Sequence, residues 1–138
     1  MIERELYLKR LRQLKDQNLI KVITGIRRCG KSTLLEAYKR ELINDGIAPE
    51  NIVFLNFEER ENLHLTNWTT LYDEIIEKVN PKERYYIFLD EVQLIIDFEK
   101  LVNSLFTKKN IDLYITGSNA YLLSSELATL LTGRYIAL

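Results

Sequence analysis

Short runs of apolar residues alternate along this chain with longer stretches in which apolar residues recur every three or four positions. Runs rich in β-branched and aromatic residues predict strands at 19–24, 51–57, 85–91, 112–117 and 135–138. The spacing of three and four predicts helices at 3–16, 32–43, 67–79, 98–108 and 119–131. Strands that alternate with helices in this way are typical of an α/β domain with a mostly parallel sheet.

Polar residues at the ends of these stretches predict where the helices begin and end. Asn18 is expected to end the first helix, and Asp97 is expected to cap the fourth. The third helix has two candidate N-caps, Thr66 and Asn67. The apolar positions of the first helix are Leu6, Leu8, Leu11 and Leu14.

A glycine-rich segment joins the first predicted strand to the second predicted helix. It fits the pattern G-x-x-x-x-G-K-[ST] and reads Gly25-Ile26-Arg27-Arg28-Cys29-Gly30-Lys31-Ser32, followed by Thr33. A strand before this pattern and a helix after it are the context in which it forms a phosphate-binding loop. A solvated turn that merely caps a helix is the weaker alternative.

The residue types of this loop are suited to binding a nucleoside triphosphate. Gly25 and Gly30 allow backbone angles that turn successive N–H groups towards the phosphates, and the following helix presents its positive N-terminal end. Lys31 can reach the β- and γ-phosphates, and the Ser32 hydroxyl can bind Mg²⁺. The loop therefore predicts a nucleoside triphosphate and Mg²⁺ as ligands, bound by residues 25–33.

Acidic residues follow the third predicted strand. Asp90 and Glu91 end an apolar run, in the position of a Walker B motif, and the carboxyl ends of parallel strands are where ligands bind. Asp90 is expected to hold Mg²⁺, and Glu91 to accept a proton from the attacking water or to orient it. Because adjacent carboxylates repel each other, we also expect a cation nearby. A surface-exposed acidic turn is the alternative.

Three further positions are candidates for the same site. Asn119 or Ser118, after the fourth strand, could contact the γ-phosphate or the water, although either could equally cap a helix. Arg134, before the last strand, could pair locally or act as an arginine finger on the nucleotide of a neighbouring subunit. Asn56, at the tip of the second strand, could contact Glu91 and hold it inactive.

Composition and charge narrow the class of partner. The 138 residues have a formal net charge of −1, so no overall basic field favours nucleic acid. The first 31 residues, however, contain nine Lys and Arg against three Asp and Glu. Contact of residues 9–15 with DNA is therefore an alternative to a solvated helix face.

The remaining features concern cellular location and redox chemistry. No apolar run is long enough to span a membrane, and no signal-like segment opens the chain, so we expect a cytoplasmic protein without a membrane partner. Cys29 is the only cysteine, which excludes an internal disulfide and a Cys-based zinc site. A small loop residue is a better interpretation of Cys29 than a redox centre.

Four segments in this order resemble one family, the AAA-type ATPase domain of prokaryotic ATP-binding proteins that carry a C-terminal nuclease-like domain of unknown function. The segments are 25–33, 88–93, 115–119 and 132–135. The resemblance implies a three-layer αβα sandwich of the AAA+ type with strand order 5-1-4-3-2. It also implies Walker A, Walker B, sensor and arginine-finger roles for residues 25–33, Asp90 with Glu91, Asn119, and Arg134.

The family's helical lid and C-terminal domain have no counterpart in these residues. We therefore expect one ATPase core domain, 1–138, with an N-terminal helix at 1–18 and an αβα core at 19–138, as part of a longer protein. The expected partners are ATP, the missing C-terminal domain and, through Arg134, further copies of the chain.

Hydrolysis of ATP, coupled to an attached domain or a partner, is the favoured function. A slow or non-hydrolysing nucleotide-gated switch or DNA-associated module is the alternative. A small-molecule kinase is disfavoured because no substrate pocket or Arg-bearing lid is evident. A GTPase is disfavoured because the Asp90 segment lacks D-x-x-G and no N-K-x-D motif occurs.

Overall fold

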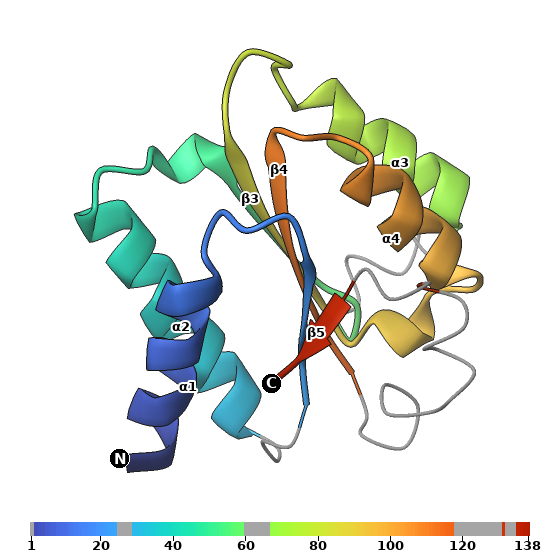
Figure 1. Ribbon diagram of the computed structural model, residues 1–138. Helices are drawn as coiled ribbons and strands as arrows, with labels where there is room; N and C mark the ends of the chain where they lie inside the picture. The colour runs from blue at the N-terminus through green and yellow to red at the C-terminus, as the bar shows by residue number, and fades with distance from the viewer. Residues whose placement is uncertain (1, 25–28, 60–66, 118–130, 132–134) are drawn as a thin grey trace.

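Five parallel strands form a single sheet at the centre of the computed structural model, which describes residues 2–24, 29–59, 67–117, 131 and 135–138 (Figure 1). The spatial order of the strands is β2-β3-β4-β1-β5. The strands are β1 (Ile20–Ile23), β2 (Ile52–Asn56), β3 (Tyr85–Asp90), β4 (Ile111–Thr116) and β5 (Tyr135–Ala137). Every pairing between neighbours is parallel. The order confirms the predicted 5-1-4-3-2 sheet.

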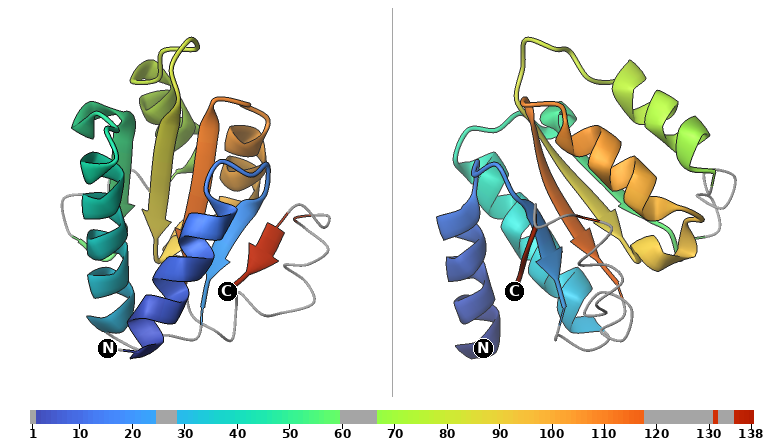
Figure 2. Two further views of the ribbon diagram at one scale, coloured as in Figure 1. Left: turned by 60° about the vertical axis from the view of Figure 1, so that its left-hand side comes forward. Right: turned by 45° about the vertical axis from the view of Figure 1, so that its right-hand side comes forward.

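Helices cover both faces of this sheet (Figure 2). One face carries α1 (Ile2–Leu14) and α2 (Cys29–Asn44), and the other carries α3 (Trp68–Glu77) and α4 (Phe98–Phe106). Short 3-10 turns, η1 (Pro49–Asn51) and η3 (Val92–Leu94), precede β2 and follow β3. The three-layer αβα sandwich is therefore confirmed. Apart from buried Leu131, the predicted helix at 119–131 lies outside the described residues.

The alternation of side chains along the strands sorts the core into two halves. In β3, Tyr86 and Phe88 pack with α1 and α2, whereas Ile87 and Leu89 pack with α3 and α4. Successive side chains of a strand point to opposite faces, so Asp90 continues the row of Tyr86 and Phe88. The acidic end of β3 therefore faces the layer that contains α2.

The first helix ends earlier than predicted. Of its four apolar positions, Leu8, Leu11 and Leu14 are buried, whereas Leu6 is 60% exposed. The helix ends at Leu14 rather than near residue 16. Asp16 has a left-handed backbone (φ 65°), and its N–H donates to Asp112 Oδ2 at 2.9 Å.

The predicted caps have different outcomes. Asn67 caps α3, since its side chain accepts hydrogen bonds from the backbone N–H groups of Thr69 and Thr70. Asp97 precedes α4 as predicted but does not cap it with its side chain. Its backbone is left-handed, and its carboxylate instead lies 3.6 Å from Lys100 Nζ.

Among the described residues, no helix has both the length and the apolar character that crossing a bilayer requires.

Candidate nucleotide site

Three neighbouring strands end at the same edge of the sheet. In the sheet, β4 lies between β1 and β3, so the carboxyl ends of these three strands are adjacent. The connection that follows β1 leads into α2, which begins at Cys29, so Lys31 lies in the first turn of the helix. The sheet order therefore directs Lys31 and the Asp90–Glu91 pair to one place.

Lys31 is nearly buried, and its amino group has two partners among the described residues. Nζ donates to the Gly117 carbonyl oxygen at 2.9 Å and lies 3.2 Å from Glu91 Oε2. An ammonium group in such a setting needs anionic or carbonyl partners to offset its desolvation. Lys31 is thus the cation that the adjacent carboxylates were expected to require.

Asp90 is almost fully buried beside the end of β4. The Thr116 hydroxyl donates to Asp90 Oδ1 and accepts the backbone N–H of Glu91 at 3.0 Å. Burial raises the pKa of Asp90, the Thr116 hydrogen bond acts against this rise, and the charge of Glu91 adds to it. A divalent cation would favour the ionised form, as it does for other carboxylate ligands.

Glu91 has an unusual backbone and two side-chain contacts. Its φ and ψ angles of 63° and 53° are left-handed, which for a residue with a side chain costs on the order of 1 kcal/mol. Oε2 faces Lys31, and Oε1 accepts a hydrogen bond from Gln93 Nε2 at 2.8 Å. The left-handed turn gives the chain a sharp change of direction between β3 and η3.

The oxygen ligands of this edge fit Mg²⁺. Within the part of the chain that the structure describes, no three His, Cys, Asp or Glu side chains gather as a closed metal cage. Mg²⁺ in phosphate sites needs only one or two protein oxygens, because water and phosphate supply the others. Asp90 offers a buried carboxylate, and Ser32 falls in the first turn of α2. These two residues would hold the ion.

The predicted site residues separate into two groups. Lys31, Asp90 and Glu91 are brought together, and Gly30 lies at the start of α2, ahead of the exposed Thr33. The other predicted positions lie outside the described residues: Gly25, Ile26, Arg27, Arg28, Ser118, Asn119, Arg134, and the side chains of Cys29 and Ser32. Their roles stay predictions.

Asn56 lies at the tip of β2, in register with Asp90. Its Oδ1 accepts a hydrogen bond from the Glu58 backbone N–H at 2.9 Å. The predicted contact between Asn56 and Glu91 stays a prediction.

Two residues of this site were not predicted from the sequence. Thr116 bonds to Asp90, and Gln93 bonds to Glu91. The Thr116 contact could have been found from register, because Leu89 pairs with Ile115 and the next residue of each strand then faces the same layer. Gln93 offered no comparable signal, since its position depends on the left-handed turn at Glu91.

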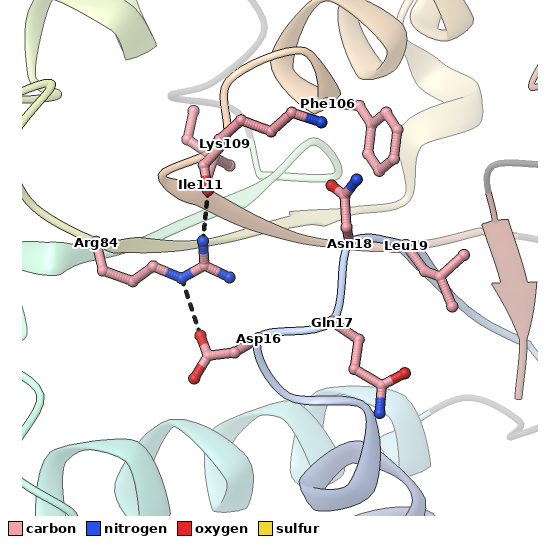
Figure 3. Close-up of a pocket in the computed structure, with 8 residues that line it drawn as sticks. All are labelled: Asp16, Gln17, Asn18, Leu19, Arg84, Phe106, Lys109 and Ile111. Carbon is pink, nitrogen blue, oxygen red and sulfur yellow. Dashed lines mark hydrogen bonds and ion pairs between the residues drawn. The ribbon is translucent and has the colours of Figure 1, made fainter.

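A separate pocket of about 190 Å³ opens at the other end of the same three strands (Figure 3). Its lining residues are Asp16, Gln17, Asn18, Leu19, Arg84, Phe106, Lys109 and Ile111. Arg84 spans it, donating to Asp16 Oδ1 at 2.9 Å and to the Lys109 carbonyl oxygen at 2.6 Å. Because these residues precede or begin the strands, this pocket is distinct from the Lys31 site.

The sheet order and the Lys31 site together define a P-loop domain of the AAA+ ATPase type. A family model described as "AAA domain" matches residues 17–138. The chain therefore belongs to the AAA domain family.

Two curated relatives match most of the chain. An uncharacterized protein of Haemophilus influenzae is 49% identical over 137 residues, which is 99% of this chain and 34% of the relative. The uncharacterized protein MJ1544 of Methanocaldococcus jannaschii is 34% identical over 119 residues, which is 85% of this chain and 25% of the relative. The chain thus spans about a third or a quarter of these proteins.

Solved structures show the same fold at low sequence identity. A structure of Drosophila ORC bound to DNA superposes with a TM-score of 0.66 and 13% identity, covering 100% of this chain and 89% of that one. A structure of C. elegans PCH-2 gives a TM-score of 0.61 and 20% identity, covering 99% of this chain and 40% of that one. These similarities support the AAA+ architecture.

Proposed function

We propose that this domain binds ATP with Mg²⁺ and hydrolyses it, and that the reaction drives an attached domain or a partner. The observation that carries the proposal is the position of Lys31 Nζ, which lies between the Gly117 carbonyl and Glu91, at the edge where Asp90 is buried. A lysine in the first turn of the helix that follows a glycine-rich loop is placed to meet the phosphates.

The proposed reaction uses each described residue differently. The ammonium group of Lys31 leaves the Glu91 carboxylate and binds the β- and γ-phosphates, which carry more negative charge. The released Oε2 of Glu91 then accepts a proton from water that attacks the γ-phosphate in line, while the bond from the γ-phosphorus to the bridging oxygen breaks and ADP leaves. Asp90 and Ser32 would hold Mg²⁺, which would neutralise charge on the phosphate oxygens. Asn119 would contact the γ-phosphate or the water.

A slow nucleotide-gated switch is the second candidate. It is favoured by the two contacts of Glu91, because Lys31 and Gln93 occupy both carboxylate oxygens in the structure. In this proposal, the exposed Lys9 and Arg10 of α1 would contact DNA, as one structural relative does, and Arg134 would reach a neighbouring copy. The extra length of the curated relatives would supply the driven domain.

Thermal unfolding with Mg²⁺ and ATP, GTP or no nucleotide tests the proposal. ATP at 100 times its dissociation constant should stabilise the domain by about 2.7 kcal/mol, which raises Tm by several degrees. Lys31→Ala should abolish this shift. Lys39→Ala, a change in the same helix at a residue without a described side-chain partner, should preserve it.

Turnover assays on the same proteins distinguish the two candidates. Release of phosphate that depends on Mg²⁺ and disappears in Lys31→Ala supports the ATPase. An ATP-dependent shift without turnover supports the switch. Equal shifts in the parent protein and Lys31→Ala would overturn both.

A further inference from the structure

Gln93 is a residue of this site that neither the sequence pattern nor the proposed reaction assigns a role. It lies in the middle of η3, two residues after Glu91, and is half-buried. Its Nε2 donates to Glu91 Oε1 at 2.8 Å. The carboxylate of Glu91 only accepts hydrogen bonds when ionised, so the contact fixes which end of the Gln93 amide faces it.

The two oxygens of Glu91 are held by different groups. Lys31 faces Oε2, and Gln93 holds Oε1. When phosphates take Lys31 in the proposed reaction, Oε2 loses its partner, whereas the Gln93 contact does not involve the phosphates. Glu91 would then have one oxygen free to accept a proton and the other still bonded to the protein.

The amide oxygen of Gln93 lies at the other end of the same group. Oε1 of Gln93 is buried and has no hydrogen-bond partner among the described residues. Buried acceptors of this kind are usually satisfied, often by an ordered water. The amide therefore combines a donor used on Glu91 with an acceptor suited to a water molecule beside it.

We propose that Gln93 is a positioning residue for ATP hydrolysis, holding Glu91 towards the attacking water after Lys31 has moved to the phosphates. This inference rests on the proposed ATPase function. Gln93 acts through Glu91 and need not touch ATP itself. Its loss should therefore lower turnover without weakening nucleotide binding.

Gln93→Met tests this role because methionine has a similar shape and cannot form the hydrogen bond. The expected result is a fall in kcat of about tenfold, the effect of losing one hydrogen bond to a charged group, with the KM for ATP unchanged within about twofold. The Tm and its shift with ATP should match those of the parent protein. Gln13→Met, on the exposed side of α1, is the matched control and should leave kcat unchanged.

A double variant shows whether Gln93 acts through Glu91. Gln93→Met should cause no further loss in a Glu91→Gln background, because the group that it positions is already gone. Independent, multiplicative losses would overturn the inference. So would an unchanged kcat in Gln93→Met, or a fall in kcat that follows a lower Tm.

Failure of the inference differs from failure of the proposed function. If the parent protein shows neither an ATP-dependent shift nor turnover, the ATPase proposal fails, and the inference fails with it. If the parent hydrolyses ATP and Gln93→Met does so at the same rate, only the inference fails.

Discussion

Two lysine–carboxylate pairs lie at opposite ends of the same sheet. At the amino ends of the strands, Lys21 Nζ meets Asp112 Oδ1 at 2.5 Å, and both side chains are fully buried. At the carboxyl ends, Lys31 Nζ meets Glu91 Oε2 at 3.2 Å, and both side chains retain some exposure, 11% and 17%. The same chemical pair thus occurs once in a closed setting and once in a partly open one.

The closed pair belongs to a network that other parts of the fold complete. Lys21 also donates to the Gln17 carbonyl oxygen at 2.6 Å. Asp112 Oδ2 accepts hydrogen bonds from the Tyr114 hydroxyl and the Asp16 backbone N–H, both at 2.9 Å. Burial lowers the pKa of Lys21, and the charge of Asp112 acts against this change. Because both side chains of this pair are fully buried, Lys21 is not accessible to a phosphate.

The partly exposed pair, Lys31 and Glu91, makes fewer hydrogen bonds with the rest of the protein. Glu91 depends on Gln93 and Lys31, and Lys31 on Glu91 and the Gly117 carbonyl oxygen. A phosphate could replace Glu91 at Lys31 and leave Glu91 bonded to Gln93. Burial of a charged pair is therefore not by itself a sign of function. What distinguishes the candidate site is the partial exposure of its pair, which the proposed exchange of Glu91 for phosphate requires.

The strongest test of this comparison is Lys21→Met. Removing the ammonium leaves the Asp112 carboxylate buried without its cation, which should lower the free energy of unfolding by about 3–5 kcal/mol. Urea denaturation measures the change. Lys39→Met, at a residue without a described side-chain partner, is the control. A loss below about 1 kcal/mol would show that the Lys21–Asp112 network does not have the structural role assigned to it.

Glu91→Gln should have the next largest effect, and on turnover rather than on folding. Loss of the general base should lower kcat by about 100-fold, equivalent to about 2.7 kcal/mol, while ATP still stabilises the protein. Phosphate release and thermal unfolding measure the two properties. Glu77→Gln, at an exposed position of α3, is the control. Turnover at the parent rate would contradict the role given to Glu91.

In the nucleotide-free protein, Lys31→Ala removes the cation of the partly exposed pair, as Lys21→Met does for the buried pair. Because Glu91 is partly exposed and keeps Gln93 as a partner, the free energy of unfolding should fall by only about 1 kcal/mol. Urea denaturation of the nucleotide-free protein measures it. A loss as large as that of Lys21→Met would remove the distinction between the two pairs.

Asp16→Asn should have the smallest effect and a defined pH dependence. Burial acts to raise the pKa of Asp16, but hydrogen bonds from Tyr86 and Arg84 lower it overall, below the ordinary 3.8. The ionised carboxylate therefore stabilises the fold above that pH, and this contribution disappears as the pH falls through the lower folded value.

Since Asp16 is about half-exposed, the variant should lose about 0.5–1 kcal/mol at pH 7. Asparagine tolerates the left-handed backbone at this position, so the change tests the charge. Urea denaturation from pH 7 to below pH 3.8 should show the difference shrinking. Asp73→Asn, at an exposed position of α3, controls for the loss of charge. A difference that stays constant with pH would exclude the carboxylate as its source.

Much of the fold followed from local pattern, because the strands are short apolar runs and the helices have regular spacing. Lys31, Asp90 and Glu91 were predicted because each falls at the end of an element in a motif. Asp97 precedes α4 as predicted but does not cap it with its side chain, since side-chain capping also depends on tertiary contacts. Gln93 could not be found in this way, because its position depends on one left-handed residue.

The hydrogen bond from the Asp16 backbone N–H to Asp112 has a practical consequence for shortening the protein. The family match begins at residue 17, after α1 has ended. Leu8 and Leu11 nevertheless belong to the core that contains Tyr38, and the N–H of Asp16 bonds to Asp112. A shortened protein cut at the family boundary would uncover that core and remove a donor from the Lys21–Asp112 network. A domain boundary taken from the family match should therefore be extended here to include α1, the helix that precedes it.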